Sequence, residues 1–207
     1  METTIAPNVR ETTGRMSSSA LNNKPDQRTN SDYMRQLLDA QKRAFIAEGK
    51  VSAATRMDRL KRIYQMIGNN QQAIIEACQR DFGNRSRHQS QMSEILVIME
   101  GMRKTIKHVE KWMRPEKRQA DFPMNLLGAR AHVEYQPKGV VGNLSTWNFP
   151  VYTAIMPLAG VFAAGNRAML KLSEVTPEVS VLLQKIIADY FDETECVGII
   201  GGPETGA

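Results

Sequence analysis

Residues 137–177 constrain the fold of this chain more than any other stretch, because two extended apolar runs flank a single apolar helix there. The first run leads into a Trp-Asn-Phe-Pro turn, in which Pro150 suits the first position of a helix, where a missing N–H costs nothing. Residues 151–164 are apolar nearly all round, which predicts a buried helix. A Gly-Asn pair ends that helix, and residues 167–172 resume an extended run. The stretch therefore predicts a βαβ unit with two parallel strands.

Polar residues follow both predicted strands at their carboxyl ends. Asn148 follows the first strand, and Lys171 and Glu174 follow the second. In α/β sheets, ligands bind outside the carboxyl ends of parallel strands, so we expect these three side chains at one functional edge. Residue type alone also allows a structural role for each of them. Asn148 could bond only its own turn, and Lys171 and Glu174 could form an exposed ion pair before the next helix.

Three motifs of this stretch together resemble the aldehyde dehydrogenase superfamily, in particular its class 3 and coniferyl-aldehyde branch. They are the Trp-Asn-Phe-Pro turn, the Ala-Gly-Asn that follows it, and Lys-x-Ser-Glu-x-Thr-Pro. The resemblance covers roughly residues 31–207. It implies an α/β fold in which an N-terminal helical segment precedes an incomplete Rossmann-like parallel sheet, with a β-hairpin as an oligomerisation arm. Leu172, where a proline is common, and Asn143, usually aliphatic, depart from the family pattern.

The resemblance also implies a reaction. The family oxidises aldehydes to carboxylic acids: a cysteine attacks the carbonyl to form a thiohemiacetal, hydride leaves to a nicotinamide, and water releases the acid. Asn148 corresponds to the side-chain donor for the tetrahedral oxyanion, which has to be in place before the charge develops. Phe149 corresponds to an aromatic wall of the substrate tunnel, although its residue type fits a core position equally well.

The resemblance further assigns a set of cofactor contacts. They correspond to Leu144, Ser145, Thr146, Trp147, Lys171, Glu174 and Gly202. A carboxylate at Glu174 can accept both hydroxyls of an adenosine ribose, and the ammonium of Lys171 can donate to the same sugar. Because a carboxylate repels a 2′-phosphate, Glu174 favours NAD without excluding NADP. Gly202 would allow close approach on the adenine side.

The family's nucleophilic cysteine and general-base glutamate lie beyond the ribose motif, and the sequence reaches Ala207 before either of them. Cys196 lacks the motif of the nucleophile and opens a predicted strand, far from the strand end that holds Asn148. We therefore interpret the chain as the N-terminal portion of an NAD(P)-dependent aldehyde dehydrogenase for hydrophobic or aromatic aldehydes such as coniferaldehyde. We expect the chain alone to be inactive. The alternative is a non-catalytic interaction module that associates with an intact partner subunit.

Composition and apolar spacing divide the chain into four parts. They are a disordered arm at 1–30, a helical part at 31–113, a connector with a strand at 114–136, and the βαβ region at 137–207. The resemblance implies that 31–113 is the helical part of the cofactor-binding domain, that 114–136 is a connector and oligomerisation strand, and that 137–207 is a truncated Rossmann-like NAD(P)-binding region, with the catalytic domain absent. The strand is expected at 131–135, where polar and apolar residues alternate. By analogy with the family, it would join two copies into a dimer.

Helices are expected where apolar residues recur at helical spacing, at 31–48, after Ser52, at 71–81, at 87–112, and from Pro177 to about Tyr190. The longest, at 87–112, has a seam that repeats every three or four residues. The seam consists of Met92, Ile95, Met99, Met102, Ile106, Val109 and Met113. Thr176 is expected to cap the last helix, and a strand is expected at 196–200.

The bulk composition is that of an ordinary soluble protein, with 42% hydrophobic and 24% charged residues. No apolar run is long enough for a transmembrane helix, and no secretory signal is evident, so we expect a cytoplasmic protein. The net charge of +5 is unevenly distributed, with −3 in residues 137–207 and +8 in the first 136 residues. Because the positive charges there alternate with negative ones, we favour a solvated face near an anionic cofactor over a nucleic-acid surface.

The remaining reactive side chains predict little chemistry. His88 and His108 are too far apart along one helix to share a metal ion, so no metal site is expected. His132 alternates with apolar residues and is interpreted as a strand residue. Cys78 and Cys196 are too few for a disulfide framework, and we expect both to be inert packing residues in a reducing compartment.

Overall fold

The structure is a computed structural model that describes residues 31–206, so the predicted arm at 1–30 lies outside the described residues. The helices are α1 (Ser31–Glu48), α2 (Ala53–Asn69), α3 (Gln71–Phe82), α4 (Arg87–Ser90), the π-helix η2 (Gln91–Leu96), α5 (Val97–Trp112), α6 (Pro150–Ile155), α7 (Pro157–Ala163), α8 (Pro177–Tyr190) and the 3-10 helix η3 (Pro203–Gly206). The strands are β1 (Glu116–Arg118), β2 (Ala131–Val133), β3 (Val140–Leu144), β4 (Arg167–Lys171) and β5 (Cys196–Ile199).

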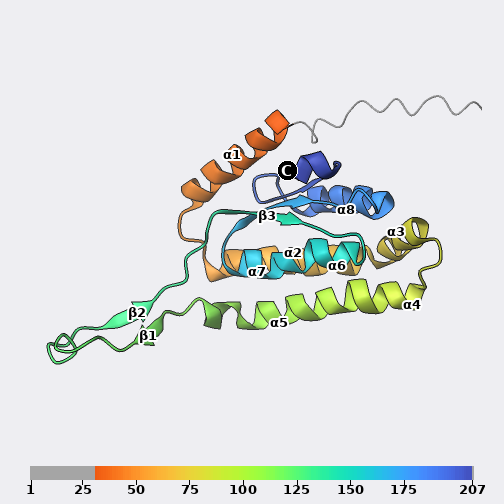
Figure 1. Ribbon diagram of the computed structural model, residues 1–207. Helices are drawn as coiled ribbons and strands as arrows, with labels where there is room; N and C mark the ends of the chain where they lie inside the picture. The colour runs from red at the N-terminus through yellow and green to blue at the C-terminus, as the bar shows by residue number, and fades with distance from the viewer. Residues whose placement is uncertain (1–30, 207) are drawn as a thin grey trace, which may run out of the picture.

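The predicted βαβ unit is confirmed. Strands β3, β4 and β5 lie in that order in one parallel sheet, with α6 and α7 connecting the first two and α8 connecting the last two (Figure 1). The register pairs Leu144 with Lys171 and Lys171 with Ile199, so all three strands end at the same edge. The fold is therefore α/β, with a helical segment preceding a small Rossmann-like sheet, as the sequence predicted.

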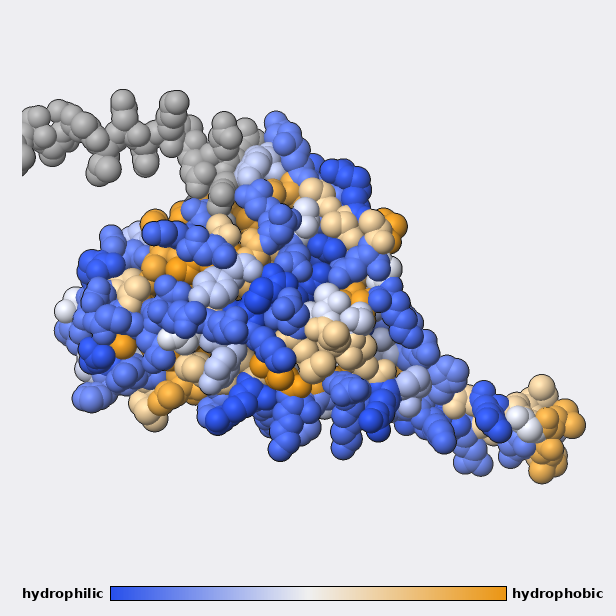
Figure 2. All heavy atoms as spheres, turned by 180° about the vertical axis from the view of Figure 1, so that it is seen from behind, coloured by the Kyte–Doolittle hydropathy of each residue, from blue (hydrophilic) through white to orange (hydrophobic). Residues whose placement is uncertain are grey.

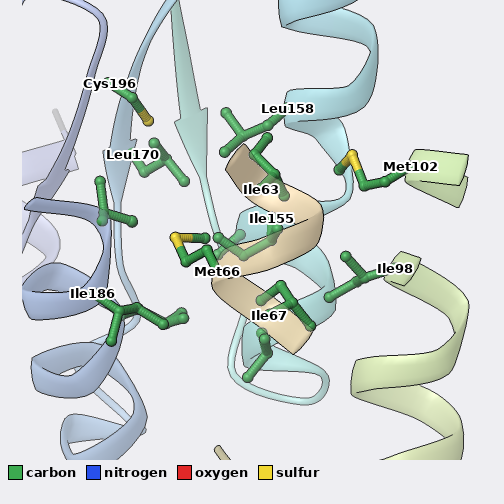
Figure 3. Close-up of a cluster of buried hydrophobic side chains, with 14 of the residues drawn as sticks. Ile63, Met66, Ile67, Ile98, Met102, Ile155, Leu158, Leu170, Ile186 and Cys196 are labelled. Carbon is green, nitrogen blue, oxygen red and sulfur yellow. The ribbon is translucent and has the colours of Figure 1, made fainter. Parts of the chain in front are cut away.

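Helices cover both faces of the sheet. On one face Leu170 and Cys196 join the main core, which extends through α2, α7 and α8 to α5. Figure 3 shows side chains of α2, among them Ile63 and Met66, between the sheet and α5. On the other face Val197 packs with the smaller cluster under α1. The strands are buried on both sides because parallel sheets are covered by their crossover helices.

Both cysteines are buried, as predicted for packing residues. Cys78 lies in the main core, where burial raises the pKa of its thiol to about 11. Burial likewise raises the pKa of Cys196, above that of an ordinary thiol. Neither side chain therefore carries thiolate near neutral pH.

The single helix expected at 151–164 is instead two short helices, α6 and α7. Pro157 opens α7, and its ring nitrogen has no hydrogen to donate to the carbonyl of Thr153 one turn earlier. The side-chain amide of Asn143 replaces that donor, at 3.1 Å from the oxygen of Thr153 and 3.0 Å from that of Ala154. The departure from the family pattern at Asn143 thus has a structural role: it caps the break in the crossover helix.

The long helix expected at 87–112 contains a π-helical segment, η2, near its start, and the predicted seam residues Ile95, Met102 and Val109 are buried. Met92, the first predicted seam residue, is 62% exposed, so that part of the prediction is wrong. A π-turn adds one residue to a helical turn and rotates the following side chains. The side chains that the helix buries completely or nearly so are Ser90, Glu94, Ile95, Ile98, Met102, Thr105 and Val109.

The amino end of α8 is capped from another helix. Thr176 precedes α8 as predicted, but its side chain makes no capping hydrogen bond. The carboxylate of Asp81, at the end of α3, accepts hydrogen bonds from the backbone N–H groups of Glu178 at 3.0 Å and Val179 at 2.9 Å. A negative charge is also favoured at this end of a helix. The predicted capping role of Thr176 is therefore wrong, and Asp81 fills it.

The connector at 114–136 forms an antiparallel hairpin. Strand β1, which was not predicted, pairs with β2, so the predicted strand at 131–135 ends at Val133. The hairpin projects away from the helices (Figure 1), and apolar side chains gather at its far end (Figure 2). These exposed side chains are Phe122, Met124, Leu126 and Leu127. The arm thus presents apolar surface well away from the core.

Ion pairs connect α1 and α2 to the amino ends of the strands. The carboxylate of Glu48 accepts from Arg59 at 2.8 Å and from Arg167, the first residue of β4, at 2.7 Å. Glu195, just before β5, accepts from Arg59 at 2.9 Å and from Arg62 at 2.7 Å. This network lies at the opposite end of the sheet from the edge where Lys171 lies.

Candidate functional site

A groove opens at the carboxyl ends of β3 and β4, with a cavity volume of about 400 Å³. The residues that line it are Leu144, Ser145, Thr146, Trp147, Lys171, Ser173, Glu174, Val175, Pro203 and Gly206. Six of the predicted cofactor contacts are among them. We call this cavity the edge groove.

Backbone pairing shapes one wall of the edge groove. Leu144 is the last paired residue of β3, opposite Lys171 of β4. The chain remains attached to β4 for one more residue, because Ser145 donates to the carbonyl of Lys171 from its backbone N–H at 3.0 Å and from its hydroxyl at 3.2 Å. Trp147 then projects beside the groove with more than half of its surface exposed. The wall therefore combines fixed backbone groups with an exposed indole.

The second wall carries a pair of opposite charges. Lys171 forms an ion pair with Glu174 three residues later, and both line the edge groove. The Lys171 side chain is largely buried, whereas the Glu174 side chain is exposed. The hydrogen bond from Lys171 keeps the pKa of Glu174 below its ordinary value, so the carboxylate is ionised at neutral pH. The pair offers an anionic acceptor and a cationic donor to the same ligand.

Asn148 lies in the turn that follows β3, at the same edge of the sheet. The Thr146 hydroxyl donates to the side-chain oxygen of Asn148 at 2.6 Å. Thr153 supports the same turn, since its hydroxyl accepts from the N–H of Thr146 at 3.1 Å and donates to the carbonyl of Phe149 at 3.0 Å. Within residues 31–206 the amide nitrogen of Asn148 makes no hydrogen bond. Asn148 therefore bonds its own turn through its oxygen, and its N–H groups remain available as donors.

Phe149 completes the turn and is partly exposed, so it is not a core residue. Its ring faces the guanidinium of Arg85, whose central carbon lies 5.3 Å from the ring centroid. Arg85 also forms a buried ion pair with Glu94. The sequence pattern predicts a site role for neither Arg85 nor Glu94. Glu94 lies within an apolar helix that the seam pattern described without it, and no local pattern connects Arg85 to residue 149.

Gly202 is the one predicted cofactor residue that does not line the edge groove. Its N–H donates to the carboxylate of Glu204 at 3.1 Å. A Cβ at Gly202 would lie 2.4 Å from that carboxylate, but the carboxylate is the far end of an exposed and flexible side chain, so this contact does not itself require a glycine. Its neighbours in η3, Pro203 and Gly206, reach the groove instead.

Other reactive groups lie elsewhere. Cys196 pairs with Ala168 at the amino end of the sheet, opposite to the edge groove. Among the described residues, His, Cys, Asp and Glu form no group that could hold a metal ion. No helix in this part of the chain is both long and apolar enough to cross a membrane.

Comparisons with known proteins identify the family of the chain. A model of the aldehyde dehydrogenase family matches residues 21–207. The chain is 46% identical over 192 residues to coniferyl aldehyde dehydrogenase of a Pseudomonas species, which covers 93% of this chain and 38% of that protein. It is 42% identical over 174 residues to a probable coniferyl aldehyde dehydrogenase of Caulobacter vibrioides, with 84% and 36% covered.

A solved structure gives the same result. The substrate-bound state of Staphylococcus aureus AldH matches with a TM-score of 0.78 at 26% identity, over 84% of this chain and 37% of that one. The chain thus spans less than two fifths of the length of these relatives. The chain therefore belongs to the aldehyde dehydrogenase family, which confirms the resemblance of the motifs between residues 137 and 177.

Proposed function

We propose that this chain is the N-terminal portion of an NAD(P)-dependent aldehyde dehydrogenase that oxidises hydrophobic or aromatic aldehydes, coniferaldehyde among them, to carboxylic acids. One observation carries the proposal. Asn148 and the Lys171–Glu174 pair lie at one edge of a parallel sheet, beside a groove, in a chain that is 46% identical to a coniferyl aldehyde dehydrogenase. In the complete enzyme, residues 1–207 would form this portion.

The edge groove suits the adenosine part of the cofactor. Glu174 would accept the two ribose hydroxyls, and Lys171 would donate to the same sugar, while residues 144–147 would line the cleft beside it. The donor set fits, because a ribose diol needs an anionic acceptor and Glu174 is ionised and exposed. The same charge repels a 2′-phosphate, so NAD is the preferred cofactor. When bound, the nicotinamide supplies the hydride acceptor.

Asn148 would donate from its side-chain nitrogen to the oxyanion that forms when the aldehyde carbonyl is attacked. The turn contacts of Thr146 and Thr153 hold the amide before the charge develops, which is the condition for effective stabilisation. Phe149, the next residue, would form an aromatic wall of the substrate tunnel. The nucleophilic cysteine and the general-base glutamate would come from the part of the complete enzyme outside residues 1–207.

NADH formation with coniferaldehyde tests this function. The complete enzyme should reduce NAD with coniferaldehyde and should reduce it more slowly with acetaldehyde, because an aromatic wall favours an aromatic substrate. The purified 207-residue chain should form no NADH with either aldehyde. Absence of turnover in the complete enzyme with any aldehyde would refute the function, and robust turnover by the 207-residue chain would refute the proposed division of catalytic groups.

We also propose that the hairpin is a dimer contact. Its end carries four exposed apolar side chains, of which Leu126 and Leu127 are each more than 70% exposed. Apolar surface of this kind on an extended arm is typical of contact sites. Changing Leu126 and Leu127 to Glu should convert a dimer of the complete enzyme into a monomer in sedimentation velocity. A dimer of unchanged stability would exclude the arm as the contact.

The same arm favours one second candidate, a non-catalytic interaction module. In that role the 207-residue chain would bind an intact aldehyde dehydrogenase subunit through the hairpin. Co-expression with a tagged complete enzyme distinguishes the two. Retention of the chain, lost when Leu126 and Leu127 are changed to Glu, would support the module.

A further inference from the structure

We propose that the buried Arg85–Glu94 ion pair positions the Asn148 turn for the reaction, so that both residues are positioning residues. This inference rests on the proposed function, because Asn148 is the group that they would orient. Neither residue lies in the edge groove or in any of the family motifs described above.

The pair holds the turn at two points. A guanidinium nitrogen of Arg85 lies 2.9 Å from one carboxylate oxygen of Glu94, and the side chains are 5% and 0% exposed. Arg85 also donates a hydrogen bond of 3.1 Å to the backbone carbonyl of Asn148. The other oxygen of Glu94 accepts from the backbone N–H of Tyr152 at 2.8 Å. The pair thus connects both ends of the segment 148–152.

Aromatic contacts restrict Arg85 further. Its guanidinium carbon lies 4.4 Å from the ring centroid of Phe82 and 5.3 Å from that of Phe149. A planar guanidinium that stacks on rings and donates in fixed directions has little rotational freedom. Phe82 is the last residue of α3. Through its contact with Arg85, the turn is held against the helical part of the molecule and not only by its own loop.

Glu94 reaches the Asn148 turn from the π-helical segment η2. Glu94 lies inside η2, where the widened turn rotates the following side chains, and the residue is completely buried. π-turns of this kind are frequent at functional sites. The first backbone N–H groups of a helix lack intrahelical acceptors, and Glu94 supplies one at the start of α6. The irregular helix and the carboxylate therefore act together on the residues that follow Asn148.

Stability alone is a weak reason for such a pair. Replacing a buried ion pair by well-packed apolar residues is often neutral or stabilising, because desolvating two charges offsets their attraction. Here each partner makes one hydrogen bond to the turn, Arg85 to the carbonyl of Asn148 and Glu94 to the N–H of Tyr152. An apolar pair at these two positions would not orient the turn.

A double-mutant cycle in the complete enzyme tests the inference. Glu94→Gln and Arg85→Lys should each lower kcat by roughly 10–100-fold, the size expected from a small misplacement of a catalytic group, with the KM for NAD unchanged. In an Asn148→Ala background neither change should lower kcat further, because the positioned group is gone. Equal losses in both backgrounds, or no loss in either, would overturn the inference.

Arg59→Lys is the matched control, since Arg59 is an equally buried arginine in ion pairs at the opposite end of the sheet. It should lower the melting temperature and leave kcat unchanged. If the unsubstituted complete enzyme oxidises no aldehyde, the proposed function fails.

The fluorescence anisotropy of Trp147 tests the positioning role of the pair without a measurement of enzyme activity. In the 207-residue chain carrying Trp112→Phe, Trp147 is the remaining tryptophan, one residue before Asn148. Its fluorescence anisotropy should fall in Glu94→Gln and in Arg85→Lys but stay unchanged in Arg59→Lys. Unchanged anisotropy in both variants would show that the pair does not order the turn.

Discussion

The hydroxyl of Thr146 donates a hydrogen bond of 2.6 Å to the side-chain oxygen of Asn148. An amide has one acceptor end and one donor end, so occupying the oxygen directs the nitrogen away from Thr146. The contact spans only two residues, and it leaves the amide nitrogen as the end of Asn148 that is available as a donor. The two roles that the sequence left open for Asn148 therefore belong to different atoms. The side-chain oxygen bonds the turn, and the side-chain nitrogen remains available as a donor.

Thr146→Val should therefore lower kcat in the complete enzyme by roughly fivefold to tenfold, the equivalent of one hydrogen bond of about 1 kcal/mol. The shape of the side chain is retained, so the melting temperature should change little. Thr146→Ser keeps the hydroxyl and should retain most of the activity. Steady-state kinetics of the three proteins is the measurement, and a Val variant as active as the Ser variant would contradict the role of the hydroxyl.

Asn148→Ala should lower kcat far more, by about 100–1000-fold, because it removes a donor that stabilises the oxyanion. The affinity for NAD should be unchanged, since Asn148 does not line the edge groove. Pre-steady-state turnover and cofactor titration measure the two quantities separately. Unchanged turnover would remove Asn148 from the mechanism.

Glu174→Gln should weaken NAD binding while leaving kcat at saturating cofactor unchanged. Hydrogen bonds to a charged group contribute about 1.5–3 kcal/mol, which corresponds to a roughly 10- to 100-fold rise in the KM for NAD. The KM for NADP should stay the same or fall, because the repulsive charge is gone. Glu178→Gln, on the adjacent helix and outside the groove, is the control. An equal rise in both KM values would argue against discrimination by charge.

Asp81→Ala should destabilise the chain by about 0.5–2 kcal/mol, the usual cost of removing a helix cap. Thr176→Val should have no measurable effect, since the hydroxyl of Thr176 has no hydrogen-bond partner. Urea unfolding followed by circular dichroism compares the two variants. A larger loss for Thr176→Val than for Asp81→Ala would restore the capping role that the sequence suggested.

Stability should fall in acid partly through Glu195. Burial acts to raise the pKa of Glu195, but the hydrogen bonds and charges of Arg62 and Arg59 outweigh it, so the pKa lies below its ordinary value. A carboxylate of this kind contributes its stability above the ordinary pKa, near 4.3, and loses that contribution as the pH falls through the lowered pKa of the folded state.

Glu195→Gln should therefore cost roughly 1.5–3 kcal/mol at pH 7, and the difference from the unsubstituted chain should shrink below about pH 4. Urea unfolding at several pH values measures this difference. The exposed pair of Arg80 and Glu178 provides the control, because Glu178→Gln should have little effect at any pH. A difference for Glu195→Gln that is constant down to pH 3 would contradict the argument.

The sequence predicted the sheet edge well because its signals are local. Apolar runs bounded by turn residues determine where strands begin and end, and a βαβ unit places the ends of parallel strands together. Lys171 and Glu174 are therefore predictable as neighbours from their spacing and from the strand before them. Most of the predictions that were wrong concern helices. A proline at 157 and a π-turn near 94 both alter helical continuity, and apolar periodicity alone does not detect either change.

The contacts that were missed connect residues far apart in the chain. Asp81 caps a helix 97 residues later, and Arg85 reaches the carbonyl of Asn148 across 63 residues. Each depends on how α3 packs against the rest of the molecule. A single sequence contains no signal for such pairs, because Asp81 by itself is an ordinary charged residue near the end of a helix and Arg85 an ordinary charged residue in the loop that follows.

Arg167 and Lys171 begin and end the same five-residue strand, β4. The first binds Glu48 in the scaffold network, and the second forms an ion pair with Glu174 at the groove. Under the proposed function, substitutions around Arg167 can therefore change heat resistance without changing ligand preference. Substitutions around Lys171 can likewise change ligand preference without loosening the scaffold. The short strand makes these two traits separately evolvable.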